Sequence, residues 1–123
     1  MGHRETQPVK SISVSDLKRT IDRAPGSWLV DVRTTEEYMH AHAPGVKCVI
    51  PHTDLPSSLA QLPSDRSTPI YVICRSSHRS HQAVRVLMEL GFSEVFNVEG
   101  GMIEWVKNGF PVNSGPGVLD RRS

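Results

Sequence analysis

The residues of this sequence that are best suited to chemistry form one short segment that begins at Cys74. A cysteine thiolate is a strong nucleophile, and backbone N–H groups or a helix N-terminus beside the sulfur stabilise it. Polar and basic residues follow the cysteine without a gap: Arg75, Ser76, Ser77, His78, Arg79 and Ser80. A loop of these residues can wrap its N–H groups around the sulfur, so the segment predicts a cysteine nucleophile in a site for a small anion.

The segments on either side of this loop predict the elements that position it. Residues 70–74 are continuously apolar, as is typical of a strand buried on both faces. Beyond the loop, apolar residues recur at helical spacing: Ala83, Val84, Leu87 and Leu90. A helix is therefore expected to begin near Ser77. Sites in parallel sheets form at the carboxyl ends of strands, which is the position predicted for Cys74.

Strands alternate with helices along the rest of the chain. Further strands are expected at residues 28–32, 46–50 and 95–98. Helices are expected after the capping residues Ser13 and Thr34 and over residues 102–108, with an irregular surface connection at 51–63. This alternation predicts an α/β domain with a largely parallel central sheet and helices on both faces.

The length of 123 residues fits one domain. We expect this domain to span residues 10–112, between a flexible N-terminus at 1–9 and a flexible C-terminal tail at 113–123. The N-terminal segment offers little to bury, and the C-terminal segment begins with the composition of a mobile tail, Asn113-Ser114-Gly115-Pro116-Gly117.

Charge and composition exclude several classes of partner. The formal net charge is only +1, so no general field attracts nucleic acid or an anionic membrane. No apolar stretch approaches the roughly 20 residues that a bilayer span needs. Two cysteines without a secretory leader favour a reducing cytoplasm over a disulfide framework.

The loop after Cys74 resembles the active-site loop of rhodanese domains, which usually reads Cys-x-x-Gly-x-Arg-Ser. The resemblance spans residues 10–112 and includes three further segments. These are Asp31-Val32-Arg33 with Glu37-Tyr38, then His42-Ala43-Pro44-Gly45-Val46, and finally Glu99-Gly100-Gly101-Met102 with Trp105 and Gly109-Phe110-Pro111.

The resemblance implies a single-domain sulfurtransferase that works by double displacement without a cofactor. The thiolate of Cys74 would take a sulfur atom from a small anionic donor such as thiosulfate and hold it as a persulfide. Cyanide, a thiol or a partner protein would then accept the sulfur. Loop residues 75–80 would bind the donor anion.

Arginine side chains suit an anionic donor because their planar fork pairs with sulfonate-like oxygens. Arg75 and Arg79 are the first candidates, and Arg33 is a third. The alternative for Arg33 and Arg79 is a structural ion pair, for instance between Arg79 and Asp31 or Glu36. We therefore expect Asp31 and Glu36 to lie behind the residues that contact the donor.

Two loop residues depart from the family pattern. Ser77 stands where the family has glycine, so it stores strain if that position needs a positive φ angle. His78 stands where arginine or asparagine is common, so it lowers the local positive charge at neutral pH. Thiosulfate activity and donor preference are therefore expected to differ from those of typical members.

Three other functions compete with this interpretation. Related phosphatases and arsenate reductases use a loop with one residue more between cysteine and arginine. A sulfur carrier or a binding module would have little thiosulfate activity. A metal site could include Cys74, His78 and His81, or His40 and His42, but neither set resembles complete zinc ligation, and we expect no metal. Cys48 is expected to be a small buried residue, with a resolving thiol as the alternative.

Overall fold

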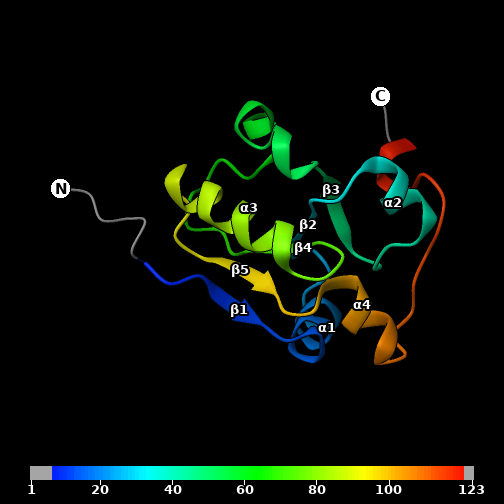
Figure 1. The fold of residues 1–123 in the computed structure, drawn as a ribbon. Coiled ribbons are helices and arrows are strands. Elements are labelled where there is room, and N and C mark those ends of the chain that lie inside the picture. The colour runs from blue at the N-terminus through cyan, green and yellow to red at the C-terminus, as the bar shows by residue number, and fades with distance from the viewer. Residues whose placement is uncertain (1–6, 121–123) are drawn as a thin grey trace.

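The computed structural model describes residues 7–120. Its centre is a five-stranded sheet in the order β1-β5-β4-β2-β3, and every neighbouring pair of strands is parallel. The strands are β1 (Lys10–Ile12), β2 (Trp28–Asp31), β3 (Val46–Val49), β4 (Ile70–Ile73) and β5 (Val95–Val98). This arrangement confirms the predicted single α/β domain with a parallel sheet (Figure 1).

The helices α1 (Val14–Arg23), α2 (Thr35–His40) and α3 (His78–Glu89) each join two consecutive strands, and α4 (Gly101–Lys107) follows β5. Short 3-10 helices are η2 (His52–Asp54) and η3 (Pro56–Gln61) in the connection from β3 to β4, and η4 (Gly117–Asp120) near the C-terminus. Ser13 and Thr34 cap α1 and α2 as predicted.

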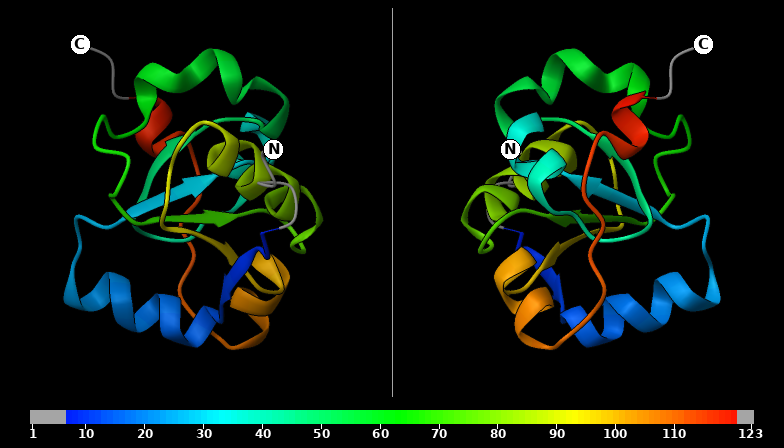
Figure 2. Two further views of the ribbon diagram at one scale, coloured as in Figure 1. Left: turned by 90° about the vertical axis from the view of Figure 1, so that its left-hand side faces the viewer. Right: turned by 90° about the vertical axis from the view of Figure 1, so that its right-hand side faces the viewer.

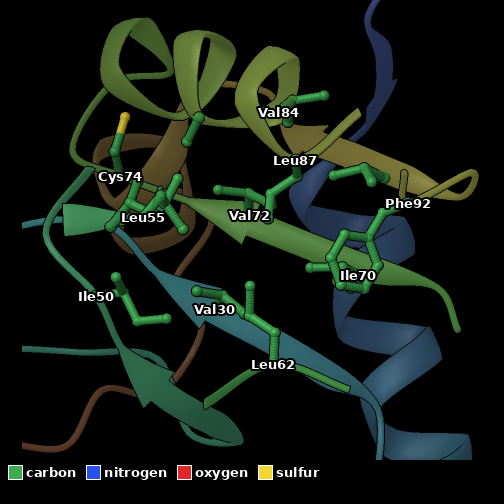
Figure 3. Close-up of a cluster of buried hydrophobic side chains, with 13 residues drawn as sticks. Val30, Ile50, Leu55, Leu62, Ile70, Val72, Cys74, Val84, Leu87 and Phe92 are labelled. Carbon is green, nitrogen blue, oxygen red and sulfur yellow. The ribbon is translucent and has the colours of Figure 1, made fainter. Parts of the chain in front are cut away.

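The sheet separates two hydrophobic clusters. On one face, side chains of β2 and β4 pack against α3 and the connection after β3, as Figure 3 shows for Val30, Val72 and Leu87. On the other face, α1, α2 and α4 contribute Leu17, Tyr38 and Trp105. The views in Figure 2 show α1 and α4 together on one side of the strands and the η2–η3 connection on the opposite side. Within residues 7–120, no helix has the length and apolar character needed to cross a membrane.

The segment after α4 differs from the expected flexible tail over residues 113–120. Asn113 and His42 exchange backbone hydrogen bonds of 2.9 Å, and the N–H of Gly115 donates to the carbonyl of Met39. Val118 and Leu119 pack against the second cluster. The prediction failed because Gly and Pro suggested mobility, whereas these two apolar residues pack the segment against the second cluster. The remaining parts of the two predicted flexible ends, residues 1–6 and 121–123, lie outside the described residues.

Candidate active site

Cys74 lies directly after β4, the central strand of the sheet, and before the N-terminus of α3. Its Sγ accepts hydrogen bonds from the backbone N–H of Ser77 at 3.1 Å and of Ser80 at 3.3 Å. Figure 3 shows the sulfur beneath the first turn of α3. These donors and the positive end of the helix stabilise negative charge on the sulfur. The residue is 1% exposed, so its sulfur is almost completely enclosed.

Ser80 lies against the sulfur rather than at the loop surface. The residue is fully buried, and its Oγ is 3.3 Å from Sγ of Cys74. The same hydroxyl donates to Oδ1 of Asn97, a buried residue of β5. A hydroxyl has one proton, so the Asn97 carbonyl and a Cys74 thiolate compete for it. Sequence analysis missed Asn97, although a polar residue inside the apolar strand β5 is the signal that could have found it.

Ser77 has a φ angle of 101°, and it is the one residue other than glycine with positive φ among residues 7–120. The loop position therefore requires the conformation that glycine adopts freely, and a serine there costs about 1–2 kcal/mol. The Ser77 hydroxyl offsets part of this cost, because it donates to the carbonyl of Ser76 and accepts from the N–H of Gly100 at 3.2 Å. The serine that stands in place of glycine thus links the loop, through its hydroxyl, to Gly100 in the turn before α4.

The N-terminus of α4 holds the loop in place through backbone hydrogen bonds. The N–H of Met102 donates to the carbonyl of Cys74 at 2.9 Å, and the N–H of Ile103 donates to the carbonyl of Arg75 at 3.0 Å. Gly101 is buried and has a φ of 56°. A Cβ on this glycine would lie 2.6 Å from the carbonyl oxygen of Arg75. Gly101 is therefore needed for the close approach of α4 to the loop.

Arg33 forms a buried ion pair instead of lining the mouth of the loop with a free charge. Its Nη2 donates to Oδ2 of Asp31 at 2.7 Å and to the carbonyl of Ala41 at 2.8 Å, and its Nε donates to Oδ1 of Asp31 at 3.0 Å. The side chains of Arg33 and Asp31 are 6% and 0% exposed. These bonds connect the end of β2 to the end of α2. Arg33 therefore forms a structural ion pair, which was the predicted alternative to binding the donor.

Arg79 also forms an ion pair, but with a residue that sequence analysis did not choose. Its guanidinium makes a two-pronged contact with the carboxylate of Glu37, at 2.8 and 2.9 Å. Neither Asp31 nor Glu36 pairs with Arg79 in the described part of the chain. Glu37 is the fourth residue of the capping box that begins at Thr34, and this box fixes its carboxylate at the start of α2. Glu36 is exposed, since neighbouring residues of a helix point in different directions.

The pairing gives Glu37 a strongly acidic carboxyl group. The hydrogen bonds from Arg79, followed by those from Thr34, lower the pKa of Glu37 from 4.5 to about 2. The stabilisation that this group contributes is therefore complete above pH 4.5 and is lost as the pH falls toward 2. The two side chains keep 26% and 32% exposure, so water screens the pair.

We expect Glu37→Gln to lower the free energy of unfolding by about 1 kcal/mol at neutral pH. The difference from wild type should shrink below pH 4, because the wild-type carboxylate is then protonated in the unfolded chain. Urea unfolding at several pH values measures this. Glu36→Gln is the matched control on the same helix and should show no such dependence. An equal loss at every pH would contradict the role of the ion pair.

The other predicted loop residues lie at the surface. Arg75, Ser76 and His78 are exposed, and Arg75 makes no ion pair with any residue between 7 and 120. Arg75 is therefore the one arginine of the three candidates whose charge is free to meet an anion. His81 directly follows the loop residues and is exposed in the first turn of α3.

The remaining candidates lie outside the loop. His42 is buried, and its Nδ1 is 2.8 Å from the carbonyl of Tyr38, on whose ring it stacks. His40 is exposed at the end of α2. Cys48 is a free cysteine on the edge strand β3, and burial raises its pKa to about 11. Within residues 7–120, no three or more His, Cys, Asp or Glu side chains form a group that could hold a metal ion.

Comparisons with known proteins identify the family of the chain. A model of the rhodanese-like domain family matches residues 13–108. A sulfurtransferase from Allochromatium vinosum is 34% identical over 85% of this chain and 94% of its own length. The putative sulfurtransferase YtwF of Bacillus subtilis is 38% identical over 85% of this chain and 98% of its own length. The putative sulfur carrier protein YrkF of the same species is 36% identical over 79% of this chain, but the match spans only 51% of that protein.

A solved structure shares the fold. The crystal structure of a rhodanese-like domain protein from Staphylococcus aureus has a TM-score of 0.74 and 31% identity, over 86% of this chain and 100% of that one.

Proposed function

The chain belongs to the rhodanese-like domain family, and on this premise we propose that it transfers a sulfane sulfur from thiosulfate to a nucleophilic acceptor through a persulfide on Cys74. The observation that carries the proposal is the position of the Cys74 sulfur. Two loop N–H groups donate to it at the N-terminus of α3. This arrangement suits a thiolate nucleophile and then the anionic persulfide that replaces it.

In the first step, the thiolate of Cys74 attacks the outer sulfur of thiosulfate. The bond between the two donor sulfurs breaks, and sulfite leaves with the electron pair. Arg75 is the cation available to hold the sulfonate-like oxygens at the loop mouth. Arg79 is paired with Glu37 and so positions the first turn of α3. From this position its positive charge contributes to the electrostatic potential at the loop.

In the second step, a nucleophile attacks the terminal sulfur of the persulfide. With cyanide as acceptor, a new carbon–sulfur bond forms, the persulfide bond breaks, and thiocyanate leaves while the Cys74 thiolate returns. A thiol, either small or on a protein, reacts in the same way and becomes a persulfide. The first step needs Cys74 as a reduced thiolate, and the second step regenerates it, so a reducing compartment such as the cytoplasm suits the cycle.

The length of the loop favours sulfur transfer over phosphate hydrolysis. Four residues separate Cys74 from Arg79, which is one fewer than in the related phosphatases and arsenate reductases. The sulfur is also almost completely enclosed, which suits contact with a single protruding sulfur atom better than with a tetrahedral phosphate.

The experiment combines turnover with mass spectrometry. Purified protein given thiosulfate and cyanide should form thiocyanate, and protein given thiosulfate alone should gain the mass of one sulfur atom on Cys74. Faster hydrolysis of an aryl phosphate than thiocyanate formation would contradict the proposal.

A second candidate function is sulfur carriage, which the similarity to the putative sulfur carrier protein YrkF favours. The same measurements separate the two functions. A stable adduct with negligible thiocyanate formation would indicate a carrier, whereas absence of both would indicate a binding module.

A further inference from the structure

Asn97 is a polar residue on the buried face of β5. It is 4% exposed, and Val95, two residues earlier on the same face of the strand, belongs to the hydrophobic cluster that packs against α3. Burying an amide among apolar side chains is unfavourable unless its polar atoms are hydrogen-bonded. The Oδ1 of Asn97 accepts a hydrogen bond from the hydroxyl of Ser80. Asn97 is therefore connected to Cys74 through the side chain of Ser80.

The three side chains form a chain of hydrogen bonds when Cys74 is a thiol. The S–H group of Cys74 donates to the Oγ of Ser80 at 3.3 Å, and the O–H group of Ser80 donates to Asn97. Cys74 is 1% exposed and Ser80 is fully buried, so water does not replace these partners. In this state each of the two protons has an acceptor of its own.

Ionisation of Cys74 disturbs this chain. The thiolate has no proton to donate, and it already accepts hydrogen bonds from the backbone N–H groups of Ser77 and Ser80. The Ser80 hydroxyl becomes a third donor only if its O–H bond turns from Asn97 to the sulfur. This rotation leaves the Asn97 carbonyl buried without a donor, which is unfavourable. The amide of Asn97 therefore favours the thiol of Cys74 over the thiolate.

The persulfide removes this competition for the Ser80 proton. Its negative charge lies on the outer sulfur, whereas the inner sulfur, which is the Sγ of Cys74, becomes a neutral divalent atom. The Ser80 hydroxyl is then free to donate to Asn97 again. Of the three states of Cys74, the thiolate is the one that Asn97 disfavours.

We propose that Asn97 is a positioning residue that acts through the Ser80 hydroxyl and destabilises the Cys74 thiolate relative to both the thiol and the persulfide. The proton that Cys74 loses goes to the solvent, and Ser80 keeps its own proton, so only the direction of its O–H bond changes. A less stable thiolate is a stronger nucleophile toward the donor and a poorer leaving group when the acceptor attacks. Asn97 thus speeds the loading of sulfur and slows its release. The inference rests on the proposed function of Cys74.

Charged and titratable side chains around the loop also influence the ionisation of Cys74. They are Arg75 and His78 of the loop and α3, the ion pairs Asp31–Arg33 and Glu37–Arg79, His52 of η2 and Glu99 after β5. All of them stay in place when Asn97 is replaced. A comparison of wild type with a variant at position 97 therefore isolates the effect of the amide.

The test replaces Asn97 by leucine, which has nearly the same size and no carbonyl in its side chain. The rate of alkylation of Cys74 by iodoacetamide, measured against pH in a Cys48→Ser background, reports the formation of the thiolate. The midpoint of this profile should fall by about one pH unit, because the Ser80 hydroxyl can then donate to the sulfur without leaving a buried carbonyl unpaired. Above both midpoints, single-turnover loading of sulfur from thiosulfate should slow about threefold, because the thiolate is a weaker nucleophile.

The same replacement in a Ser80→Ala background is the matched control. Without the hydroxyl, Asn97→Leu should leave the midpoint unchanged. Asn97→Val, with a side chain that suits a strand, repeats the measurement, and thermal unfolding verifies that each variant is folded. An unchanged or higher midpoint in Asn97→Leu, or an equal shift without Ser80, would overturn the inference. Alkylation needs no sulfur transfer, so a lower midpoint in a protein that forms no thiocyanate would reject the proposed function and keep the role of Asn97.

Discussion

Replacing Cys74 by serine should lower thiocyanate formation at least about 1,000-fold while the protein stays folded. A serine hydroxyl keeps nearly the same size and can still accept the hydrogen bonds from the N–H groups of Ser77 and Ser80. A neutral hydroxyl is, however, a far weaker nucleophile than a thiolate, and it cannot form a persulfide. Initial rates with thiosulfate and cyanide measure the loss, and thermal unfolding verifies the fold.

Cys48→Ser is the matched control for this experiment. Cys48 lies on the edge strand β3, separated from β4 by β2, and is half-buried; the loss of solvation raises the pKa of its thiol to about 11. The variant should keep the wild-type rate and should still gain one sulfur atom on Cys74. Retained activity in Cys74→Ser would refute the mechanism. Loss of activity in Cys48→Ser without unfolding would instead assign a resolving role to the second thiol.

The position of Cys74 could be predicted because the local pattern is strong. The continuous apolar residues of β4 and the helical spacing of the apolar residues in α3 predict a strand, a loop and a helix in that order. Strand β1 was missed, because Lys10, Ser11 and Ile12 are too few and too polar to form a pattern. Its hydrogen bonds to β5 on one side determine its structure, and such long-range pairing is not visible in a local window.

The partners of the arginines show a second limit of sequence reasoning. The capping box from Thr34 to Glu37 was recognised as a helix start, yet Glu36 was chosen as the carboxylate near the loop. The choice depended on how α2 is oriented toward α3, and this orientation comes from packing across the sheet. Asn97 was missed for the same reason, since its contact with Ser80 joins β5 to the loop.

Gly101→Ala should cause the largest loss of stability among the substitutions considered, about 3 kcal/mol or more in the free energy of unfolding. The new Cβ would meet the backbone carbonyls of Cys74 and Arg75, which cannot rotate away as a side chain could. The φ of 56° adds the cost of a left-handed residue. The hydrogen bonds from Met102 and Ile103 to the loop would then lengthen or break.

Gly109→Ala separates the two causes of this loss. Gly109 also has a positive φ, 75°, but a Cβ there would have no atom within 4 Å. This control should lose only about 1 kcal/mol, the cost of the backbone conformation. The difference between the variants measures the clash with the loop. Because a displacement of about 1 Å lowers rates about 100-fold, folded Gly101→Ala should also transfer sulfur about 100-fold more slowly, whereas Gly109→Ala should keep its rate. Equal stability in the two variants would show that α4 does not hold the Cys74 loop in place.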